Sequence, residues 1–314
     1  MRIKYNKKNI KPAKRQIQKS VNKELIQHIQ KTAFEIKHIP HDSGFFSVFN
    51  GLMNNLTYSN ENDIIIPYWT MIGIKGHDFN YYENRTQNVW DSFFEPIKMK
   101  KKKDYSYIQI SRFGVWLNNS FFGYHYYGRK NTRIWANFVY NNILKNTEWR
   151  QKVNEKYKKY IKPKQHINNK INNFYEKYMI NQNCIGVHVR NKNHNIEQPK
   201  NIMPSYKDYF KEIKDNCDYK NSLIFLATDN NVALNAFRNE FKNNLIYQDD
   251  IDRTEIEDFR QLHRYRSPSK KLGEDVLSDC ILLSKCNKLF HIISNVAIAA
   301  MYMNPKMKNY LLIG

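Results

Sequence analysis

The C-terminal half of the chain is predicted to be an α/β unit built on a parallel, Rossmann-like sheet. Short apolar runs alternate there with segments of helical pattern, and such alternation favours parallel strands joined by right-handed crossovers. The predicted strands cover residues 184–190, 223–228, 245–247 and 288–293, and the predicted helices cover 206–213, 231–242, roughly 274–286 and 295–303. The chain has 314 residues, which is enough for two domains. We expect an N-terminal α/β domain over residues 1–175 and a C-terminal Rossmann-like domain over residues 176–314.

The stretch at residues 184–197, CIGVHVRNKNHNIE, is predicted to begin with a strand that delivers His188 and Arg190 to its carboxyl end. Ligands of open α/β sheets bind beyond the carboxyl ends of the strands. The planar guanidinium of Arg190 could hold two phosphate oxygens there at once. The alternative is an arginine that only closes a strand and pairs with a carboxylate.

Composition excludes a disordered chain, because 41% of the residues are hydrophobic and 14% are aromatic. The formal net charge of +22 implies an anionic partner: nucleic acid, an acidic membrane surface or a nucleotide-bearing substrate. Residues 1–40 form a basic arm with a helical apolar pattern from Leu25 to Ile36. This arm could lie on an anionic membrane, or its apolar stripe could pack on the domain.

The four cysteines show neither a Cys-x-x-Cys spacing nor a neighbouring His pair, so we expect free thiols and no zinc or redox motif. The N-terminus lacks the apolar core of a signal peptide, and nowhere do eighteen apolar residues run together. We therefore expect a cytoplasmic protein, unless an anchor was removed, with the basic arm as an open route to a membrane surface.

The N-terminal half is predicted to contain a helix that carries Leu52, Met53 and Leu56, followed by a strand at residues 64–66. Gly44 precedes this helix. A loop with a glycine at the start of a helix can present backbone N–H groups to an anion, and a plain turn is the alternative.

Three further segments of this half are distinguished by composition. Residues 89–96 are predicted to be a packing segment. Aromatic residues crowd among glycines between Arg112 and Arg133, where we expect an acceptor or ribose site, with a corner of the core as the alternative. Residues 150–180 are dense in Lys, Asn and Tyr, and we expect them to connect the two domains.

The C-terminal half contains three sequence blocks: GVHVR at residues 186–190, FLATDN at 225–230 and GEDVLSDCILLSKCNKLFHIISN at 273–295. In order and spacing, these blocks resemble those of the fucosyltransferase superfamily. That superfamily includes the α1,6-fucosyltransferases and the nodulation fucosyltransferases, and the resemblance covers roughly residues 184–303. It implies a GT-B-like fold, in which two Rossmann-like α/β domains face each other across a cleft. It also implies a glycosyltransferase that moves fucose from GDP-fucose to a glycan or glycolipid acceptor without a metal cofactor.

The resemblance and the chemistry of sugar transfer together assign the site residues. Transfer from a nucleoside diphosphate needs a positive group at the leaving diphosphate and a base for the acceptor hydroxyl. Arg190 is predicted to neutralise the diphosphate, and Ser294 and Asn295 open a helix whose N-terminus favours a phosphate. The resemblance further implies that His188 touches the nucleotide, that Asp279 binds guanine and that Asp229 is needed for activity. A helix N-cap is the alternative role for Asp229.

The chain departs from the family pattern beyond Arg190. The α1,6 enzymes continue with a second Arg, then an Asp and a Lys, whereas this chain has Asn191, Asn193 and His194. His194 is retained among the predicted donor-binding residues. The catalytic Glu of the family lies eight residues after its Arg, where this chain has Gln198, with Glu197 one residue earlier. A one-residue difference in the loop would make Glu197 the base.

Two other functions are open from the sequence. Asp250-Ile251-Asp252 fits the Asp-x-Asp pattern with which other glycosyltransferases hold a divalent cation, so a metal-dependent enzyme using another nucleotide sugar is one alternative. The other is a basic nucleic-acid-binding protein without catalysis, supported by charge and aromatic content. No helix-turn-helix, zinc-finger or RNP signature accompanies that charge, so we expect no nucleic-acid partner.

Overall fold

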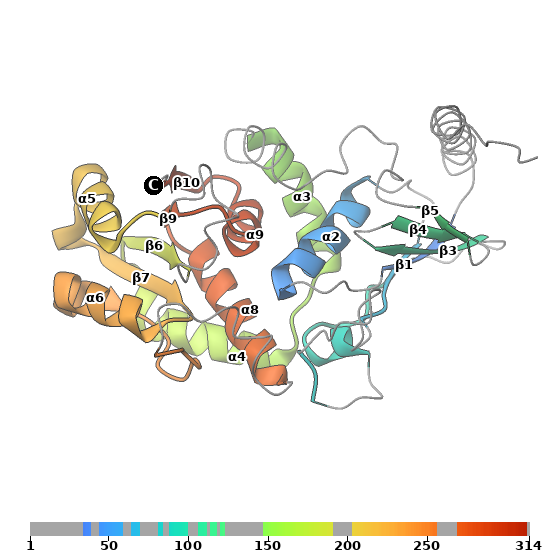
Figure 1. The fold of residues 1–314 in the computed structure, drawn as a ribbon, viewed down its shortest axis with the longest axis horizontal. Coiled ribbons are helices and arrows are strands. Elements are labelled where there is room, and N and C mark those ends of the chain that lie inside the picture. Colours follow the sequence, from blue (N-terminus) through green and yellow to red (C-terminus); the bar gives the residue numbers. More distant parts are fainter. Residues whose placement is uncertain are drawn as a thin grey trace, which may run out of the picture.

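The computed structural model contains two sheets with helices packed between and around them (Figure 1). The structure describes residues 34–38, 44–58, 64–69, 81–83, 88–99, 106–111, 114–117, 120–122, 147–190, 203–255 and 269–312. We call the first sheet with its helix α2 the N-terminal unit, and the second sheet with the helices on its faces the C-terminal unit.

The first sheet has the strand order β2-β1-β3-β4-β5. Its strands are β1 (Phe34–His38), β2 (Ile64–Pro67), β3 (Ser106–Ser111), β4 (Gly114–Leu117) and β5 (Ser120–Phe122). Strand β1 pairs in parallel with both β2 and β3, while β4 and β5 add antiparallel strands at one edge. Two pieces of the aromatic segment at residues 112–133 are therefore edge strands, and residues 123–133 lie outside the described residues.

The helical pattern predicted to run as far as Ile36 is wrong at its end, because residues 34–38 form β1. Pairing with a strand on each side satisfies the backbone of this segment, and this tertiary pairing outweighs a weak local helical periodicity. The rest of the predicted basic arm, residues 1–33, lies outside the described residues.

The second sheet is wholly parallel and has the order β10-β9-β6-β7-β8. Its strands are β6 (Cys184–Val189), β7 (Leu223–Thr228), β8 (Leu245–Ile246), β9 (Lys288–His291) and β10 (Lys308–Leu311). The first four confirm the predicted strands, and β10 was not predicted. The predicted parallel α/β fold of this half is confirmed.

Helices cover both faces of the second sheet (Figure 1). Strand β6 alternates its side chains between two apolar clusters: Ile185 and Val187 pack with α5 (Tyr206–Asn216) and α6 (Asn231–Phe241). Gly186 faces α8 (Lys270–Ser284) on the other side, with which α9 (Asn295–Met303) packs. A Cβ on Gly186 would come within 3.2 Å of Leu283 and Cys286, so the glycine allows α8 to lie close to the sheet.

Residues 150–180, which were predicted to connect the two domains, are largely helical. They lie in α3 (Thr147–Tyr160), α4 (Gln165–Phe174) and a π-helical turn (Tyr175–Met179). Helix α3 packs partly through the polar side chains of Arg150 and Asn154, which weakens its apolar pattern. Asn154 Nδ2 donates to the carbonyl oxygens of Tyr302 and Met303, both at 2.8 Å, and so satisfies the C-terminus of α9.

One apolar core runs through both units. Helix α2 (Phe45–Tyr58) carries the predicted apolar positions into it, and the predicted packing segment at residues 89–96 is confirmed, because Trp90, Phe93 and Phe94 are buried. Helix α3 contacts both α2 and α9, and α4 contacts α8. A domain boundary near residue 175 stays a prediction.

All four cysteines are free thiols, and three of them are buried. No helix within the described ranges is long and apolar enough to cross a membrane.

Candidate functional site

The order of the second sheet places a topological switch point between β6 and β9. From β6 the chain proceeds to β7 and β8 on one side of the sheet, and it later forms β9 and β10 on the other side. Crossover loops diverge at such a point and leave a crevice beyond the carboxyl ends of the two strands, where ligands of open α/β sheets bind. Arg190 directly follows β6, and Ser294 follows β9 at the start of α9.

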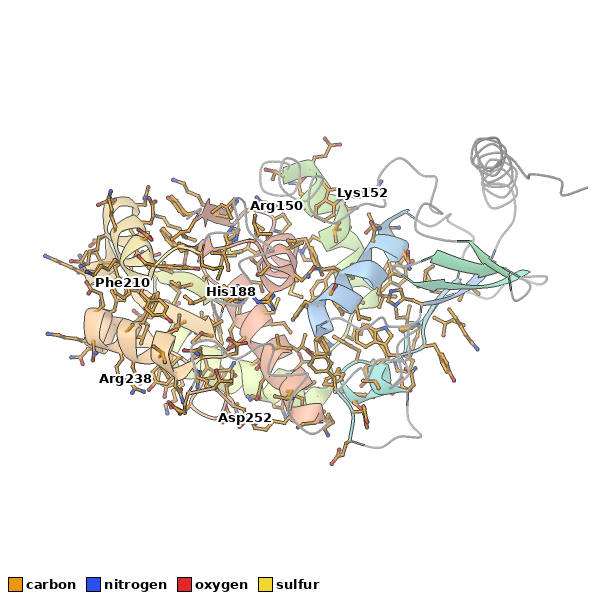
Figure 2. All side chains as sticks on the ribbon, in the orientation of Figure 1. Arg150, Lys152, His188, Phe210, Arg238 and Asp252 are labelled. Atoms are coloured by element: carbon orange, nitrogen blue, oxygen red, sulfur yellow. The ribbon has the colours of Figure 1, made fainter. Side chains whose placement is uncertain are left out.

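The first and third sequence blocks meet in a hydrogen bond at this point. Ser294 Oγ lies 3.1 Å from Nδ1 of His188. Ser294 is also the N-cap of α9, where its hydroxyl accepts from the backbone N–H of Ala297 at 3.0 Å. Both side chains are buried, and His188 lies on the side of the sheet where α9 packs (Figure 2). The structure therefore brings two predicted donor-binding residues together at the N-terminus of a helix.

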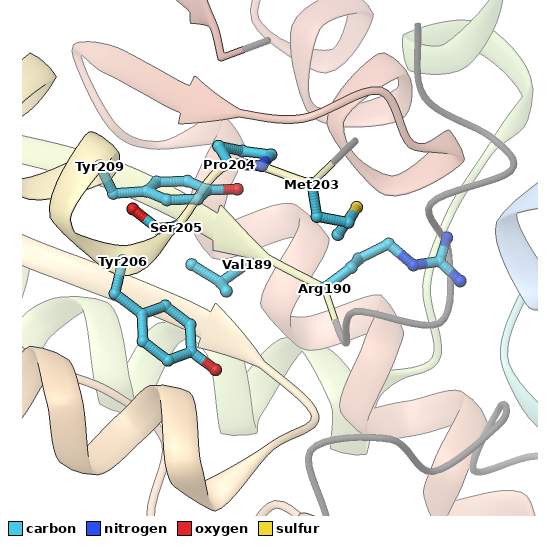
Figure 3. A pocket seen from close by; sticks show the side chains of 7 residues that line it. All are labelled: Val189, Arg190, Met203, Pro204, Ser205, Tyr206 and Tyr209. Carbon is cyan, nitrogen blue, oxygen red and sulfur yellow. The ribbon is translucent and has the colours of Figure 1, made fainter. Parts of the chain in front are cut away.

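Arg190 is half-buried at the end of β6. Its side chain points away from Tyr206 and Tyr209 and toward the N-terminal unit (Figure 3). The guanidinium group of Arg190 thus lies in the region beyond the carboxyl ends of the strands, as predicted for a group that holds a diphosphate.

A pocket of about 130 Å³ lies on the other side of Arg190 (Figure 3). It is lined by Val189, Arg190, residues 203–206 and Tyr209. Ser205 caps α5 from here, since its hydroxyl accepts from the Asp208 N–H while the Asp208 carboxylate accepts from the Ser205 N–H. The pocket is therefore distinct from the space into which the guanidinium points.

Asp229 stands beside Arg190 at the carboxyl edge of the sheet. Val189 of β6 pairs with Thr228 of β7, so the next residue of each strand is Arg190 and Asp229 respectively. The N-cap alternative for Asp229 is wrong, because Asn230 caps α6 by accepting from the N–H of Ala233 at 3.0 Å. Oδ1 of Asp229 is buried and has no hydrogen-bond partner within the described part of the chain. A buried carboxylate oxygen without a partner is costly, and such groups concentrate at functional sites.

Asp279 lies in a buried network on α8. Its Oδ1 accepts from Nε2 of Gln248 at 2.7 Å, and the same amide lies 3.1 Å from the hydroxyl of Ser278. Burial raises the pKa of Asp279 to about 7, although the hydrogen bond from Gln248 and the charge of Arg253 oppose the shift. The network fixes Asp279 to the segment that follows β8, and a role in binding guanine stays a prediction.

The remaining predicted site residues divide into two groups. Asn295 begins α9 as predicted, and its side-chain oxygen accepts from Asn50 of α2 at 3.1 Å, so it joins the two units. Glu197 and His194 lie outside the described residues, and their roles stay predictions.

Sequence reasoning missed two residues around this edge. Gln248 holds Asp279, and Arg253 donates to the carbonyl oxygens of Gln248 at 2.8 Å and Thr228 at 3.2 Å, which ties the segment after β8 to the end of β7. Gln248 directly follows the predicted strand at residues 245–247, and Arg253 lies in the segment after it, which was the available signal.

The first carboxylate of the Asp-x-Asp segment at residues 250–252 forms an ion pair with a lysine. A carboxylate oxygen of Asp250 lies 2.7 Å from Nζ of Lys170, which also pairs with Asp275 at 3.2 Å. Within the described ranges, no three His, Cys, Asp or Glu side chains gather in a way that could hold a metal ion.

Two α/β units, with candidate phosphate-binding residues at the switch point of the second, have the organisation of a glycosyltransferase of the GT-B type. Residues 153–297 match the family model described as the N- and catalytic domains of α-(1,6)-fucosyltransferase. This family match confirms the resemblance to the fucosyltransferase superfamily seen in the three blocks. A comparison with curated protein sequences finds no match.

Solved structures of fucosyltransferases have a similar fold. A crystal structure of NodZ α-1,6-fucosyltransferase soaked with GDP-fucose matches with a TM-score of 0.50 and 13% identity, covering 87% of this chain and 93% of that one. NodZ from Bradyrhizobium matches with a TM-score of 0.47 and 16% identity over 86% and 92% of the two chains. POFUT1 in complex with GDP-fucose matches with a TM-score of 0.34 and 11% identity, covering 51% of this chain and 49% of that one. The first match supports the GT-B fold, and the two others are too distant to support an argument.

Proposed function

We propose that the protein transfers fucose from GDP-fucose to a glycan or glycolipid acceptor without a bound metal ion. The observation that carries the proposal is the hydrogen bond between His188 and Ser294 at the switch point, with Arg190 two residues beyond His188. These residues surround the place where a nucleoside diphosphate binds in open α/β sheets.

The chemistry of the leaving group follows from this arrangement. Cleavage of the sugar–phosphate bond leaves growing negative charge on the β-phosphate, which Arg190 neutralises with two parallel hydrogen bonds. The N-terminus of α9, opened by Ser294, adds its partial positive charge at the same place. Fixed groups of this kind stabilise the transition state because they need no reorganisation during the reaction.

A carboxylate must accept the proton of the acceptor hydroxyl, and we assign this role to Glu197. Asp229 is the carboxylate that the fold holds beside Arg190, with one buried oxygen available to accept a hydrogen bond from a donor or acceptor hydroxyl. We assign it to substrate orientation, because its buried oxygen can accept a hydrogen bond from a sugar hydroxyl.

Metal independence is supported by the counter-charge that the chain itself supplies. Asp250, the first carboxylate of the Asp-x-Asp segment, pairs with Lys170, while Arg190 and α9 supply positive charge at the strand ends. We also propose a cytoplasmic location, with contact to an anionic membrane through the basic residues near the N-terminus.

Calorimetric titration of the purified protein tests the proposal. GDP should bind with the same affinity in the presence and absence of EDTA, and more tightly than UDP. Incubation with GDP-fucose should release GDP slowly. A large loss of affinity on chelation would instead favour the metal-dependent alternative. Preference for a single-stranded oligonucleotide over GDP at raised salt would contradict the proposal, because non-specific nucleic-acid binding falls steeply with salt.

A further inference from the structure

The side-chain amide of Gln248 lies in a buried network with two side chains of α8. Nε2 of Gln248 donates to Oδ1 of Asp279 at 2.7 Å and to the hydroxyl of Ser278 at 3.1 Å. That hydroxyl donates in turn to the carbonyl oxygen of Asp275 at 3.0 Å, so it accepts from Gln248. A carboxylate and an engaged hydroxyl are both acceptors, and the amide nitrogen must therefore face them. These bonds fix which way round the amide lies.

The backbone of Gln248 is held as firmly as its side chain. Nη2 of Arg253 donates to the carbonyl oxygen of Gln248 at 2.8 Å, and Nε of the same arginine donates to the carbonyl oxygen of Thr228, the last residue of β7, at 3.2 Å. Gln248 is only 3% exposed. Buried hydrogen bonds of this kind are costly to break without replacement. The amide therefore holds a defined position at the carboxyl edge of the sheet.

Helix α8 joins this network to the start of α9, where the candidate donor site lies. The thiol of Cys280, the residue after Asp279, donates to the carbonyl oxygen of Val296 at 3.5 Å, in the turn of α9 that Ser294 caps. Burial raises the pKa of this thiol well above its usual value, so it adds no charge beside Asp279. Asp279 keeps 8% of its surface exposed. Its carboxylate thus stands near the donor site without being wholly enclosed.

Several groups act on the charge of Asp279. Its pKa is raised to about 7, chiefly by burial and to a smaller extent by the negative charge of Asp275 one turn earlier on α8. The hydrogen bond from Gln248 is the strongest opposing effect, ahead of the positive charges of Arg253 and of Lys170 on α4. A donated hydrogen bond favours the ionised form of a carboxylate. Removal of the amide would therefore leave Asp279 protonated to a higher pH.

We propose that Gln248 is a positioning residue for base recognition, which holds the carboxylate of Asp279 ready to accept the adjacent N–H donors of guanine. The inference rests on the proposed function, because it takes Asp279 as the group that binds the base of GDP. An ionised carboxylate can accept two neighbouring N–H groups, whereas a protonated one presents a donor to one of them. The amide serves Asp279 at its own expense, since Oε1 of Gln248 is buried with no partner among the residues that the structure describes.

The test measures GDP and ADP affinity by calorimetry at a series of pH values on both sides of neutrality. ADP carries the same diphosphate, but its base has an acceptor in place of the adjacent donor pair, so the ratio of the two affinities cancels the ionisation of the phosphates. In the parent this ratio should rise with pH as Asp279 ionises. In Gln248→Met the rise should occur about one pH unit higher, and the ratio at pH 7 should be roughly tenfold lower.

The matched control is Asn244→Ala, which removes a side-chain amide at the other end of β8. This amide donates to the carbonyl oxygens of three residues before β7 and does not touch Asp279. The control should have the parent's ratio at every pH. Asp279→Asn should lose the pH dependence, and addition of Gln248→Met to it should change the ratio no further, because Gln248 acts through Asp279. Gln248→Glu keeps the length of the side chain and should move the rise in the same direction as Gln248→Met.

The outcomes separate this inference from the function beneath it. A parent protein that does not bind GDP would refute the proposed function itself. If the parent binds GDP and the ratio does not depend on pH, or depends on it identically in the parent and in both Gln248 variants, the inference is wrong and the function stands. Equal losses of GDP and ADP affinity in those variants, with no shift along the pH axis, would also overturn it, because Gln248 would then act only through packing.

Discussion

Ser294 and His188 are 106 positions apart in the sequence, and their side chains lie 3.1 Å apart in the structure. The bond links the end of β6 to the start of α9, so the two elements that flank the switch point share one contact. Substitution of Ser294 by Ala should lower the free energy of unfolding by about 1 kcal/mol through loss of the cap, and should also weaken GDP binding. Ser205→Ala, which removes the cap of α5, is the matched control. Equal GDP affinity in both variants would mean that Ser294 is only a cap.

Arg190→Ala should leave the fold intact and lower turnover by roughly a hundredfold or more, which corresponds to about 3 kcal/mol of transition-state stabilisation. Arg190→Lys should recover only part of the rate, because an ammonium keeps the charge and loses the bidentate fork. Arg238→Ala, on the exposed face of α6 (Figure 2), is the matched control and should react like the parent. Steady-state GDP release from GDP-fucose measures all three. If Arg190→Ala turned over as fast as the parent, Arg190 would not neutralise the leaving diphosphate.

The two candidate carboxylates should respond differently to neutralisation. Glu197→Gln should abolish turnover and spare GDP affinity, because a base acts on the acceptor hydroxyl and not on the nucleotide. Asp229→Asn should leave the protein at least as stable as the parent, since the Oδ1 atom that it affects is buried and lacks a partner within the described residues, while turnover falls at least tenfold. Urea unfolding and turnover are measured on both variants. A strongly destabilised Asp229→Asn would identify Asp229 as a structural residue.

Asp279 should make stability depend on pH between its unfolded and folded pKa values. Burial raises its pKa from 3.8 to about 7, so in this range the folded state binds the proton more tightly than the unfolded state. Stability contributed by the protonated carboxyl is therefore present below pH 4 and is lost as the pH rises to 7, by an amount on the order of a few kcal/mol. Asp279→Asn should flatten this part of the profile. Urea titrations at pH 5 and pH 8 compare parent and variant, and parallel profiles would contradict the prediction.

Gly273 allows α8 to approach the packing segment of the N-terminal half. A Cβ at this position would lie 2.4 Å from Cζ of Phe93, whose ring is completely buried. Gly273→Ala should therefore destabilise the protein by about 1–3 kcal/mol through overpacking. The double variant Gly273→Ala with Phe93→Leu should recover part of that loss, as thermal unfolding would show. Additive losses in the double variant would mean that the ring is not the obstacle.

The C-terminal fold could be predicted because each element there carries its own local signal. The strand at residues 223–228 is a continuous apolar run, and the helix at 295–303 begins at a serine cap and ends before Pro305. Helix α3 has no such signal: only Arg150, Val153 and Asn154 are buried, and two of these bind backbone carbonyls at distant positions. Packing of that kind exists only once the partner helix is in place.

The site was predictable to the extent that it lies at strand ends. His188, Arg190 and Ser294 follow from the positions of β6 and α9 in the sequence. Gln248 could not be found this way, since it acts on a residue 31 positions away. The position of Asp279 could be predicted from its sequence block, but its burial beneath the amide of Gln248 could not.

Helix α9 is held at both ends by asparagines from the first half of the chain, Asn50 at its start and Asn154 at its end. These two hydrogen-bonded ends limit which chimeras between this protein and its relatives can fold. A C-terminal sheet transplanted from a relative would bring its own version of α9, whose termini would meet the asparagines of the host. Exchanges that cut near residue 175 should therefore succeed when the incoming α9 matches residues 50 and 154 and fail when it does not. In such an exchange, α9 would have to be transferred together with these two distant side chains.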